Sequence, residues 1–352
     1  MFFVLFLSIF SVRAWAGPVN EGIFGPDRLN HVLGQDGVTP IPIKLRDGTQ
    51  ACLWTFGDTI LGGWKGSVVT TATVDFNAAA DMNAMPSNTL ALTPAPSSAN
   101  YRNLDFTFYA PDGKIREFIG YREGENPLVK RMWADDGIQL DDLIYVYYMD
   151  VELDKNVPGG FSFKGMGLAR SALPLKAEPG MLAFKRINAF KAEGVVIGDS
   201  VIAVGEYLYL LGRASKMNDG RLTSLTLLRV KPADIESLSR YEYLTQAGEW
   251  SGKERGAFFE DVSGEASLVY DAFKKVFRII YMSFDSQEIK TAEFRDFKAF
   301  AKAPEAAPLY KPPAKKDTLY YSAKEIFSDR NYFHLIYIDP SIYQPILVKI
   351  ER

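Results

Sequence analysis

The chain has 352 residues, 47% hydrophobic and 13% aromatic, which is enough apolar material for a large buried core. Its formal net charge of -3 provides no basic surface of the kind that binds nucleic acid, so we expect no nucleic-acid partner. One cysteine, Cys52, and two histidines exclude an internal disulfide and argue against a Cys/His metal site.

The first 16 residues have the pattern of a secretory signal peptide. Residues 2–10 form an apolar run too short to span a bilayer, and Ala14-Trp15-Ala16 is a small-residue cleavage site. No Lys or Arg precedes the apolar run, and a misassigned start or a buried strand is the alternative. We expect a secreted or periplasmic protein with a single domain over residues 17–352 and no membrane-spanning segment after signal removal.

One pattern recurs along the rest of the chain. An acidic residue opens a segment, a polar turn follows, and then come an aromatic strand and a second strand that ends on a basic residue. Copies recur at intervals of roughly 55 to 90 residues, which is typical of a radial β-propeller. The aromatic strands are expected at residues 52–56, 143–148, 207–211, 277–282 and 334–338. The sequence therefore predicts an all-β protein, a five-bladed β-propeller.

The connections are expected where strand-forming residues are scarce. Residues 77–99 are rich in Ala, Asn, Ser and Pro and predict a loop over one face. Residues 301–316 contain four prolines and predict a long connection before the last blade. The expected blades are residues 36–111, 133–187, 193–245, 264–300 and 319–352.

Each expected blade opens with a carboxylate. A propeller places the start of every inner strand around one central funnel, so these groups are expected to face one another. They are Asp36, Asp136 with its neighbour Asp135, Glu193, Glu265 and Glu325. In the first blade the aromatic strand ends at Phe56-Gly57-Asp58, and antiparallel connectivity brings Asp58 to the end where Asp36 lies.

Grouped carboxylates support three kinds of chemistry. They divide acid and base roles, hold a hard cation such as Ca²⁺, or accept hydrogen bonds from sugar hydroxyls. In glycoside hydrolysis one carboxyl protonates the leaving oxygen, and the other attacks the sugar or activates water. Asp36-Gly37 is also a common hairpin signal, so a turn is the alternative for Asp36. Asp58 follows an apolar strand, where burying a lone carboxylate is costly.

Further residues are expected to bind substrate near the funnel. Trp64 and Trp133 follow or precede the acids and offer faces for sugar rings, with loop packing as the alternative. Arg213 follows an aromatic strand and either holds a ligand oxygen or makes an ion pair with the carboxylates. The Asn88 side chain either makes a hydrogen bond within a turn or points toward the site. The full set of candidates is Asp136, Glu193, Glu265, Trp64, Trp133, Asn88 and Arg213.

These blocks resemble an exported protein family long described as a domain of unknown function. The specific block is Leu53-Trp54-Thr55-Phe56-Gly57-Asp58-Thr59, with Asp36 before it and Ser87-Asn88-Thr89 after it. Trp133-x-x-Asp136-Gly137 and Glu265-Ala266-Ser267 continue it, so that the resemblance covers most of the mature chain. It implies a five-bladed propeller, similar in architecture to arabinanases and fructosidases, in a family that includes endo-D-arabinanases.

Asp36 and Asp58 match two acidic positions of this family, so the resemblance implies that they are the two catalytic acids. One would be nucleophile or base and the other the acid. This chain departs from the pattern in two places: an insert at residues 38–50, and Ala323-Lys324-Glu325-Ile326 where a His-Pro-Glu-like turn is expected.

The sequence thus favours a secreted hydrolase that cleaves a furanosyl-type, arabinan-like polysaccharide or oligosaccharide and needs no cofactor. It contains no Gly-x-Ser-x-Gly elbow, phosphate loop or dinucleotide fingerprint to favour another chemistry. Two alternatives remain at this point. One is a non-catalytic carbohydrate-binding propeller, and the other is an envelope-associated propeller stabilised by Ca²⁺.

Overall fold

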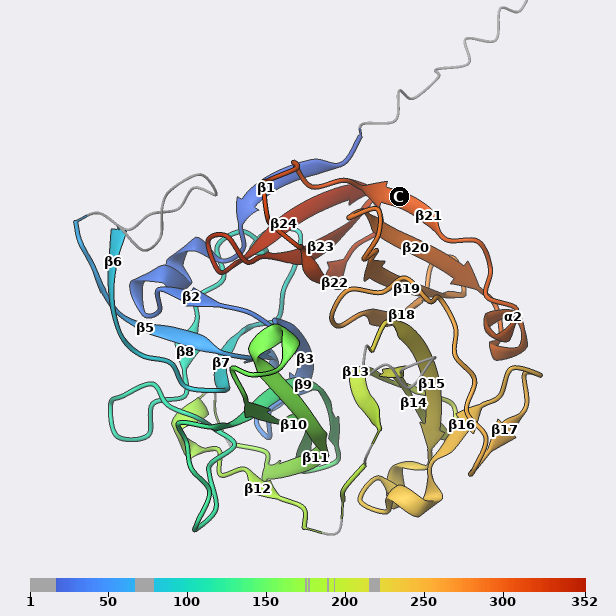
Figure 1. Cartoon of the computed structure of the whole chain (residues 1–352), viewed down its shortest axis with the longest axis horizontal. Helices are drawn as coiled ribbons and strands as arrows, with labels where there is room; N and C mark the ends of the chain where they lie inside the picture. Colours follow the sequence, from blue (N-terminus) through green and yellow to red (C-terminus); the bar gives the residue numbers. More distant parts are fainter. Residues whose placement is uncertain are drawn as a thin grey trace, which may run out of the picture.

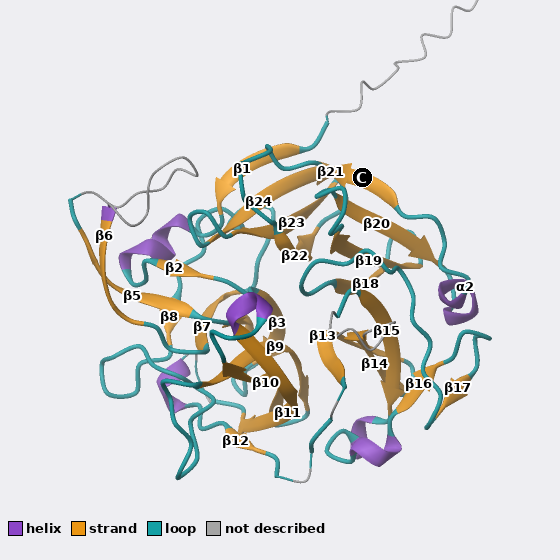
Figure 2. Ribbon diagram, viewed as in Figure 1, coloured by secondary structure: helices purple, strands orange, loops and turns teal. Residues whose placement is uncertain are grey.

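The computed structural model describes residues 17–66, 79–174, 176, 178–188, 190–192, 194–214 and 222–352. The expected signal peptide and Glu193 lie outside these residues. Over the described ranges the chain is almost entirely antiparallel β-sheet, which confirms the all-β prediction (Figure 2). The sheets lie side by side around a common centre, in a propeller-like arrangement (Figure 1).

Five sheets contain four or five strands each. The first sheet comprises β3 (Thr39–Lys44), β4 (Gln50–Phe56), β7 (Thr89–Pro94) and β8 (Thr107–Phe108). The second comprises β9 (Lys130–Leu140), β10 (Leu143–Leu153), β11 (Phe161–Ala172) and β12 (Lys185–Arg186). The third comprises β13 (Val195–Val204), β14 (Tyr207–Ala214), β15 (Ser224–Val230), β16 (Glu242–Leu244) and β17 (Trp250–Ser251).

The fourth sheet comprises β18 (Ser267–Asp271), β19 (Val276–Met282), β20 (Ile289–Phe294) and β21 (Ala307–Tyr310). The last sheet comprises β22 (Tyr321–Ser328), β23 (Tyr332–Asp339), β24 (Gln344–Glu351) and β1 (Val19–Ile23). The five expected aromatic strands fall within β4, β10, β14, β19 and β23, the second strand of each sheet from the centre outward.

A smaller sheet lies beside the first one. It comprises β2 (Gly34–Gln35), β5 (Thr59–Trp64) and β6 (Ala80–Ala84). Because β5 continues from β4 and β2 precedes β3, this sheet flanks the corner that contains Asp36 and Asp58. Both β6 and β7 lie where a loop is expected at residues 77–99, so that expectation is wrong over these two strands; β7 is paired with β4 and largely buried.

Helical segments within the described ranges are short. They are the 3-10 helices η1 (Pro26–Asn30), η2 (Pro158–Gly160), η3 (Pro179–Met181), η4 (Pro232–Asp234) and η5 (Leu238–Arg240), and the α-helix α2 (Phe297–Ala301). Asp296 caps α2 by accepting a hydrogen bond from Ala299 N at 2.8 Å. The connection expected at residues 301–316 contains the end of α2 and all of β21. None of the helices in the described part of the chain is long and apolar enough to cross a membrane.

The sequence of strand β3 suits a strand at the inner edge of a sheet. Its burial alternates, with Ile41 and Ile43 buried and Pro42 exposed between them. Proline cannot donate a backbone hydrogen bond, so it is tolerated on an edge strand, and β3 is the edge of its sheet. By contrast, β4 is buried along nearly all its length because it pairs on both sides and both its faces are covered.

The inner strands contact one another in sequence: β3 with β9, β9 with β13, β13 with β18, β18 with β22, and β22 with β3. The core is divided in the same way into apolar clusters between neighbouring sheets. Tyr147 packs with Val196 between the second and third sheets, for example, and Trp54 packs with Ile336 between the first and last sheets. Each such buried side chain contributes roughly 1.5–3 kcal/mol, so the apolar contacts between sheets hold the arrangement together.

The two ends of the described chain meet in the last sheet. Strand β1 pairs with β24 in antiparallel register, with Val19 opposite Lys349 and Ile23 opposite Ile346. The expected last blade, residues 319–352, therefore lacked one strand that comes from the other end of the chain. This pairing closes the sequence of sheets by hydrogen bonds as well as by packing.

Candidate active site

Asp36 and Asp58 lie side by side at the start of the first sheet. Asp36 N donates to Asp58 O at 3.3 Å, and Gly57 N donates to Asp36 O at 2.9 Å. The antiparallel connectivity anticipated from the sequence produces this juxtaposition. A Cβ at Gly57 would lie 2.5 Å from Asp36 Oδ1, so only glycine leaves room for the carboxyl group at this point.

The Asp36 carboxyl is held by two phenols, one from β22 and one from the turn between β23 and β24. Tyr321 OH and Tyr343 OH donate to Asp36 Oδ2 at 3.0 and 2.9 Å. Burial and the nearby charge of Asp58 raise the pKa of Asp36 to about 8, although the two phenols act in the opposite direction. This environment favours the protonated form of the carboxyl, while the residue remains partly exposed to solvent.

Asp58 is more deeply buried, yet its carboxyl is the stronger acid. Burial raises the pKa of Asp58 to about 6, and the charge of Arg131, whose Nε lies 3.5 Å from Asp58 Oδ1, limits the rise. The indole N–H of Trp133 also favours the ionised form, without meeting the geometry of a hydrogen bond. The corner thus pairs a protonated carboxyl with an ionised one at neutral pH, which is the division that acid–base catalysis requires.

A second group of carboxylates lies next to this corner, at the centre of the molecule. Asp135 of β9 and Asp199 of β13 are buried, and Glu265 precedes β18. Arg213 of β14 joins two of them, with Nε 2.8 Å from Asp199 Oδ2 and an Nη 3.1 Å from Glu265 Oε1. Because these residues come from successive sheets, the inner strands deliver charged groups to one shared region.

The last sheet adds a cation and a hydroxyl to the centre. Lys324 Nζ donates to Thr39 Oγ1 at 2.5 Å, and Ser322 Oγ donates to Glu265 Oε2. Burial acts to raise the pKa of Glu265, but the charges of Arg213 and Lys324 outweigh it and hold that pKa below its usual value. Burial and the charge of Asp199 raise the pKa of Asp135 well above its ordinary range.

Three of the expected substrate-binding residues make structural contacts. Asp136 accepts backbone hydrogen bonds from Gly137 at 2.7 Å and Val201 at 2.8 Å, which fastens β9 to β13, and burial raises its pKa to about 7. Trp64 donates to Leu29 O at 2.9 Å from the small sheet. Asn88 is fully buried and accepts hydrogen bonds from the backbone of residues 118 and 119. A role for these three in binding substrate stays a prediction.

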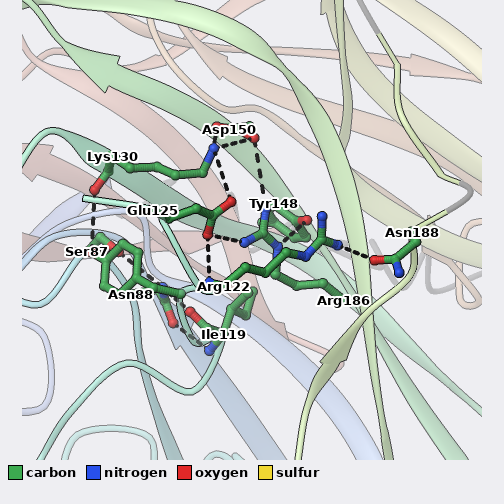
Figure 3. Close-up of polar contacts among 11 residues, drawn as sticks. Ser87, Asn88, Ile119, Arg122, Glu125, Lys130, Tyr148, Asp150, Arg186 and Asn188 are labelled. Carbon is green, nitrogen blue, oxygen red and sulfur yellow. Dashed lines mark hydrogen bonds and ion pairs between the residues drawn. The ribbon is translucent and has the colours of Figure 1, made fainter. Parts of the chain in front are cut away.

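Asn88 belongs to a polar network that holds the connection before β9 in place (Figure 3). Glu125 in this connection pairs with Arg186 at 2.5 Å, and Lys130 pairs with Asp150 at 2.7 Å. Arg186 also donates to Tyr148 OH at 2.9 Å (Figure 3). These contacts fix the first residue of β9, and Arg131, which faces Asp58, follows it directly.

Glu325, the carboxylate expected to face the funnel from the last blade, makes an ion pair with Arg278 instead. Glu325 pairs with Arg278 at 2.8 Å, in a cluster that also contains Asp271 and Arg352. Its neighbour Lys324 reaches the centre instead, because the strand pairing is irregular between Tyr321 and Lys324. No group of three or more Cys, His, Asp and Glu side chains in the described ranges could hold a metal ion.

Sequence reasoning missed five residues of this region: Asp199, Tyr321, Ser322, Lys324 and Tyr343. Asp199 could have been predicted from a local sequence pattern. It follows glycine inside an apolar strand, as Asp58 does in Phe56-Gly57-Asp58. The other four come from the last sheet and the turn before β24, where no motif marks them.

The fold and the site define a class: an all-β, propeller-like protein with ionisable side chains at its centre. The model of the family described as Domain of unknown function (DUF4185) matches residues 37–320, and the chain belongs to this family. A search of curated proteins found no match.

Several solved structures are similar. A candidate hydrolase from Bacteroides ovatus ATCC 8483 has a TM-score of 0.67 at 15% identity, covering 91% of this chain and 86% of that chain. An α-L-arabinofuranosidase from Lactobacillus brevis has a TM-score of 0.49 at 9% identity, covering 92% and 93%. The GH43_1 enzyme from Xanthomonas citri complexed with xylose has a TM-score of 0.49 at 12% identity, covering 94% and 90%. The likeness to the Bacteroides protein shows a shared fold.

Proposed function

We propose that the protein is a glycoside hydrolase in which Asp36 is the proton donor and Asp58 is the nucleophile or general base. The observation that carries the proposal is the adjacency of two carboxyl groups whose pKa values, about 8 and about 6, lie on opposite sides of neutrality. Environments that separate two such pKa values assign the acid and the base.

Each step of the reaction has a group to perform it. Asp36 transfers its proton to the glycosidic oxygen as the bond from that oxygen to the anomeric carbon breaks. Asp58 either attacks the anomeric carbon, to be displaced later by water, or takes a proton from a water molecule that attacks directly. Both routes add one water across the bond and return both carboxyls to their starting states.

We infer that the five larger sheets are the blades of a five-bladed propeller. The successive contacts of the inner strands and the pairing of β1 with β24 support this reading. A funnel at the centre of such a disc would let a polysaccharide reach the corner at Asp36 and Asp58.

The substrate class we propose is a furanosyl polysaccharide of the arabinan type. Its support is the resemblance of the Phe56-Gly57-Asp58-Thr59 block and its surroundings to the family that includes endo-D-arabinanases. We further propose that the protein is exported, since residues 1–16 have the pattern of a cleaved signal. Export would place it where extracellular polysaccharides are found.

A reducing-end assay tests the function. Purified protein is incubated with arabinan, arabinogalactan, xylan and fructan, and the expected result is release of new reducing ends from arabinan. Asp36→Asn and Asp58→Asn should each abolish release. Asp47→Asn is the matched control, because Asp47 is an exposed turn residue bonded to Thr49 N. Binding of a glycan that survives both active-site changes, without release from any glycan, would instead indicate a non-catalytic carbohydrate-binding protein.

A further inference from the structure

The hairpin formed by β10 and β11 lies at the same end of the molecule as the catalytic pair. Thr55, opposite Thr39, donates to Asp135 O at 2.8 Å, and Lys44 N donates to Gln139 Oε1 at 2.7 Å. Strands β3 and β9 therefore run side by side in the same direction. Since Asp36 precedes β3, it is level with the first residues of β9, and the 3.5 Å ion pair of Arg131 with Asp58 agrees with this.

The tip of the hairpin rises from this end. Glu152 pairs with Lys130, the first residue of β9, and Leu153 pairs with Phe161, so the turn between β10 and β11 lies beyond the first residue of β9. In Figure 1 the light green helical turn that joins β10 to β11 lies in front of the middle of the disc. A backbone hydrogen bond from Asp154 N to Gly160 O at 2.9 Å closes this turn.

Two aromatic rings connect the catalytic pair to this hairpin. Trp133 lies beside Asp58 and favours its ionised form. On its other side, Trp133 meets Phe161 edge to face, with ring centroids 4.7 Å apart and an angle of 77° between the rings. Phe161 is 40% exposed, so the path from Asp58 through Trp133 ends on an aromatic ring that solvent reaches.

Two further exposed apolar side chains lie at the same end of the hairpin as Phe161. Val129 O accepts a hydrogen bond from Leu153 N, which brings exposed Leu128 and Val129 to the same rim as Phe161. Trp133 Nε1 is buried without a hydrogen-bond partner among the described residues. An exposed aromatic ring that packs on Trp133 beside the catalytic pair, flanked by apolar side chains, suits a sugar, whose C–H face packs on rings.

We infer that Phe161, Trp133 and the Leu128–Val129 rim form a subsite that binds a furanose unit next to the one that is cleaved. This inference rests on the proposed function. It assigns to the β10–β11 hairpin the preference for a polysaccharide chain over a single sugar. The catalytic pair acts on one glycosidic bond, and the subsite holds the neighbouring part of the same chain. A substrate too short to reach Phe161 loses this contact and keeps the others.

The test measures binding without catalysis. In the Asp36→Asn background, calorimetry with arabino-oligosaccharides of two to six units should show affinity rising with length up to the length that reaches Phe161. Adding Phe161→Ala should weaken binding of the longest oligosaccharide about five- to tenfold and leave that of the disaccharide unchanged. Phe161→Tyr, which keeps the ring, should retain the affinity. Phe273→Ala is the matched control, because Phe273 is 66% exposed in the turn between β18 and β19 of the fourth sheet.

Unchanged affinity of the Phe161→Ala protein for every oligosaccharide, with its melting temperature also unchanged, overturns the subsite. Absence of binding by the Asp36→Asn protein overturns it as well. Hydrolysis by the unmodified protein is measured separately, so the two ideas can fail separately. Length-dependent binding that needs Phe161, in a protein that releases no reducing ends, supports the subsite and contradicts the proposed catalysis.

Discussion

Two aspartates in this molecule each accept two side-chain hydrogen bonds on Oδ2, yet their pKa values are shifted in opposite directions. Asp271 Oδ2 accepts from the guanidinium groups of Arg278 and Arg352, whereas Asp36 Oδ2 accepts from two phenols. Burial opposes ionisation at Asp271, but the backbone N–H of Lys274 and the two guanidiniums hold its pKa well below the usual range. At Asp36 the donors are neutral and the nearest charge, on Asp58, is negative, so its pKa rises to about 8.

The charge of the hydrogen-bond donors, more than their number, therefore decides whether a carboxylate stabilises the fold or holds a transferable proton. The Asp271 cluster joins the fourth and last sheets through ion pairs of Asp271 with Arg278 and Arg352 and of Glu325 with Arg278. At the corner that contains Asp36 and Asp58, the ion pair found among the described residues is that of Arg131 with Asp58. Such an arrangement is costly for folding and useful for catalysis.

The largest expected effect is on catalysis at the corner. Asp36→Asn removes the proton donor and should lower kcat/KM by about 10²–10⁴-fold, measured as release of reducing ends from arabinan. Asp271→Asn should leave kcat/KM within about twofold, because its cluster touches none of the reacting groups. Equal losses in the two variants would contradict the distinction drawn between the two aspartates.

The effects on stability should be reversed. Asp271→Asn leaves two buried guanidiniums short of one negative charge and should cost about 3 kcal/mol in the free energy of unfolding. Asp36→Asn replaces a carboxyl that must take up a proton on folding at pH 7, because its pKa rises to about 8 in the folded state, so the change should raise that free energy by up to roughly 4 kcal/mol. Urea unfolding at pH 7 measures both, and a strongly destabilised Asp36→Asn protein would count against a protonated Asp36.

The two aspartates should also impose opposite dependences of stability on pH. With its pKa raised in the folded state, Asp36 binds more protons folded than unfolded, so its contribution to stability falls as pH rises from about 4 towards about 8. With its pKa depressed, Asp271 contributes stability that is present above its usual pKa and is lost as pH falls below it. Melting temperatures from pH 3 to 9 measure this, with Asp36→Asn expected to flatten the upper part of the curve.

A smaller effect, on the pH dependence of activity, tests whether Asp58 is the base. Arg131→Gln removes the cation that limits the pKa of Asp58, so this pKa should rise above about 6. The acidic limb of the pH profile of kcat/KM should then move upward by about one unit, because the base must be ionised. Lys65→Gln, at an exposed ion pair with Asp81, is the control. A profile that does not move would remove Asp58 from the role of base.

The smallest expected effect concerns Ser322. Its backbone has a φ of 55°, a left-handed conformation that favours glycine, and its hydroxyl donates to Glu265. Ser322→Gly relieves the backbone and loses the hydrogen bond, so the free energy of unfolding should change by less than about 1 kcal/mol. Ser322→Val keeps the strain, adds bulk and should destabilise more. Identical melting temperatures for these two variants would show that the conformation carries no strain.

Part of this account could be predicted from the sequence. The strands follow from aromatic and β-branched runs between turn residues, and the meeting of Asp36 with Asp58 follows from antiparallel connectivity at one strand end. Both inferences need only local patterns and short separations along the chain. The Phe56-Gly57-Asp58 block also indicated burial of the second carboxyl correctly, because Asp58 is only 7% exposed.

The rest depends on contacts between distant segments. The phenols on Asp36 come from positions 285 and 307 residues away along the chain, and β1 closes the last sheet from the other end of the described residues. Glu325 has the residue type expected for the centre, but the irregular pairing in β22 turns Lys324 inward and Glu325 toward Arg278. A one-residue change in strand register reverses the side-chain faces, and no local pattern marks it.

The protonation of Asp36 is the central claim, and carbon NMR of the aspartate carboxyls tests it without any substrate. Protein labelled at these carbons is titrated from pH 3 to 10, and the Asp36 and Asp58 signals are assigned from the Asp36→Asn and Asp58→Asn variants. We expect one signal to titrate near 8 and the other near 6. If both signals titrate below 5, the corner holds two ionised carboxylates at neutral pH and the proposed division into acid and base is wrong.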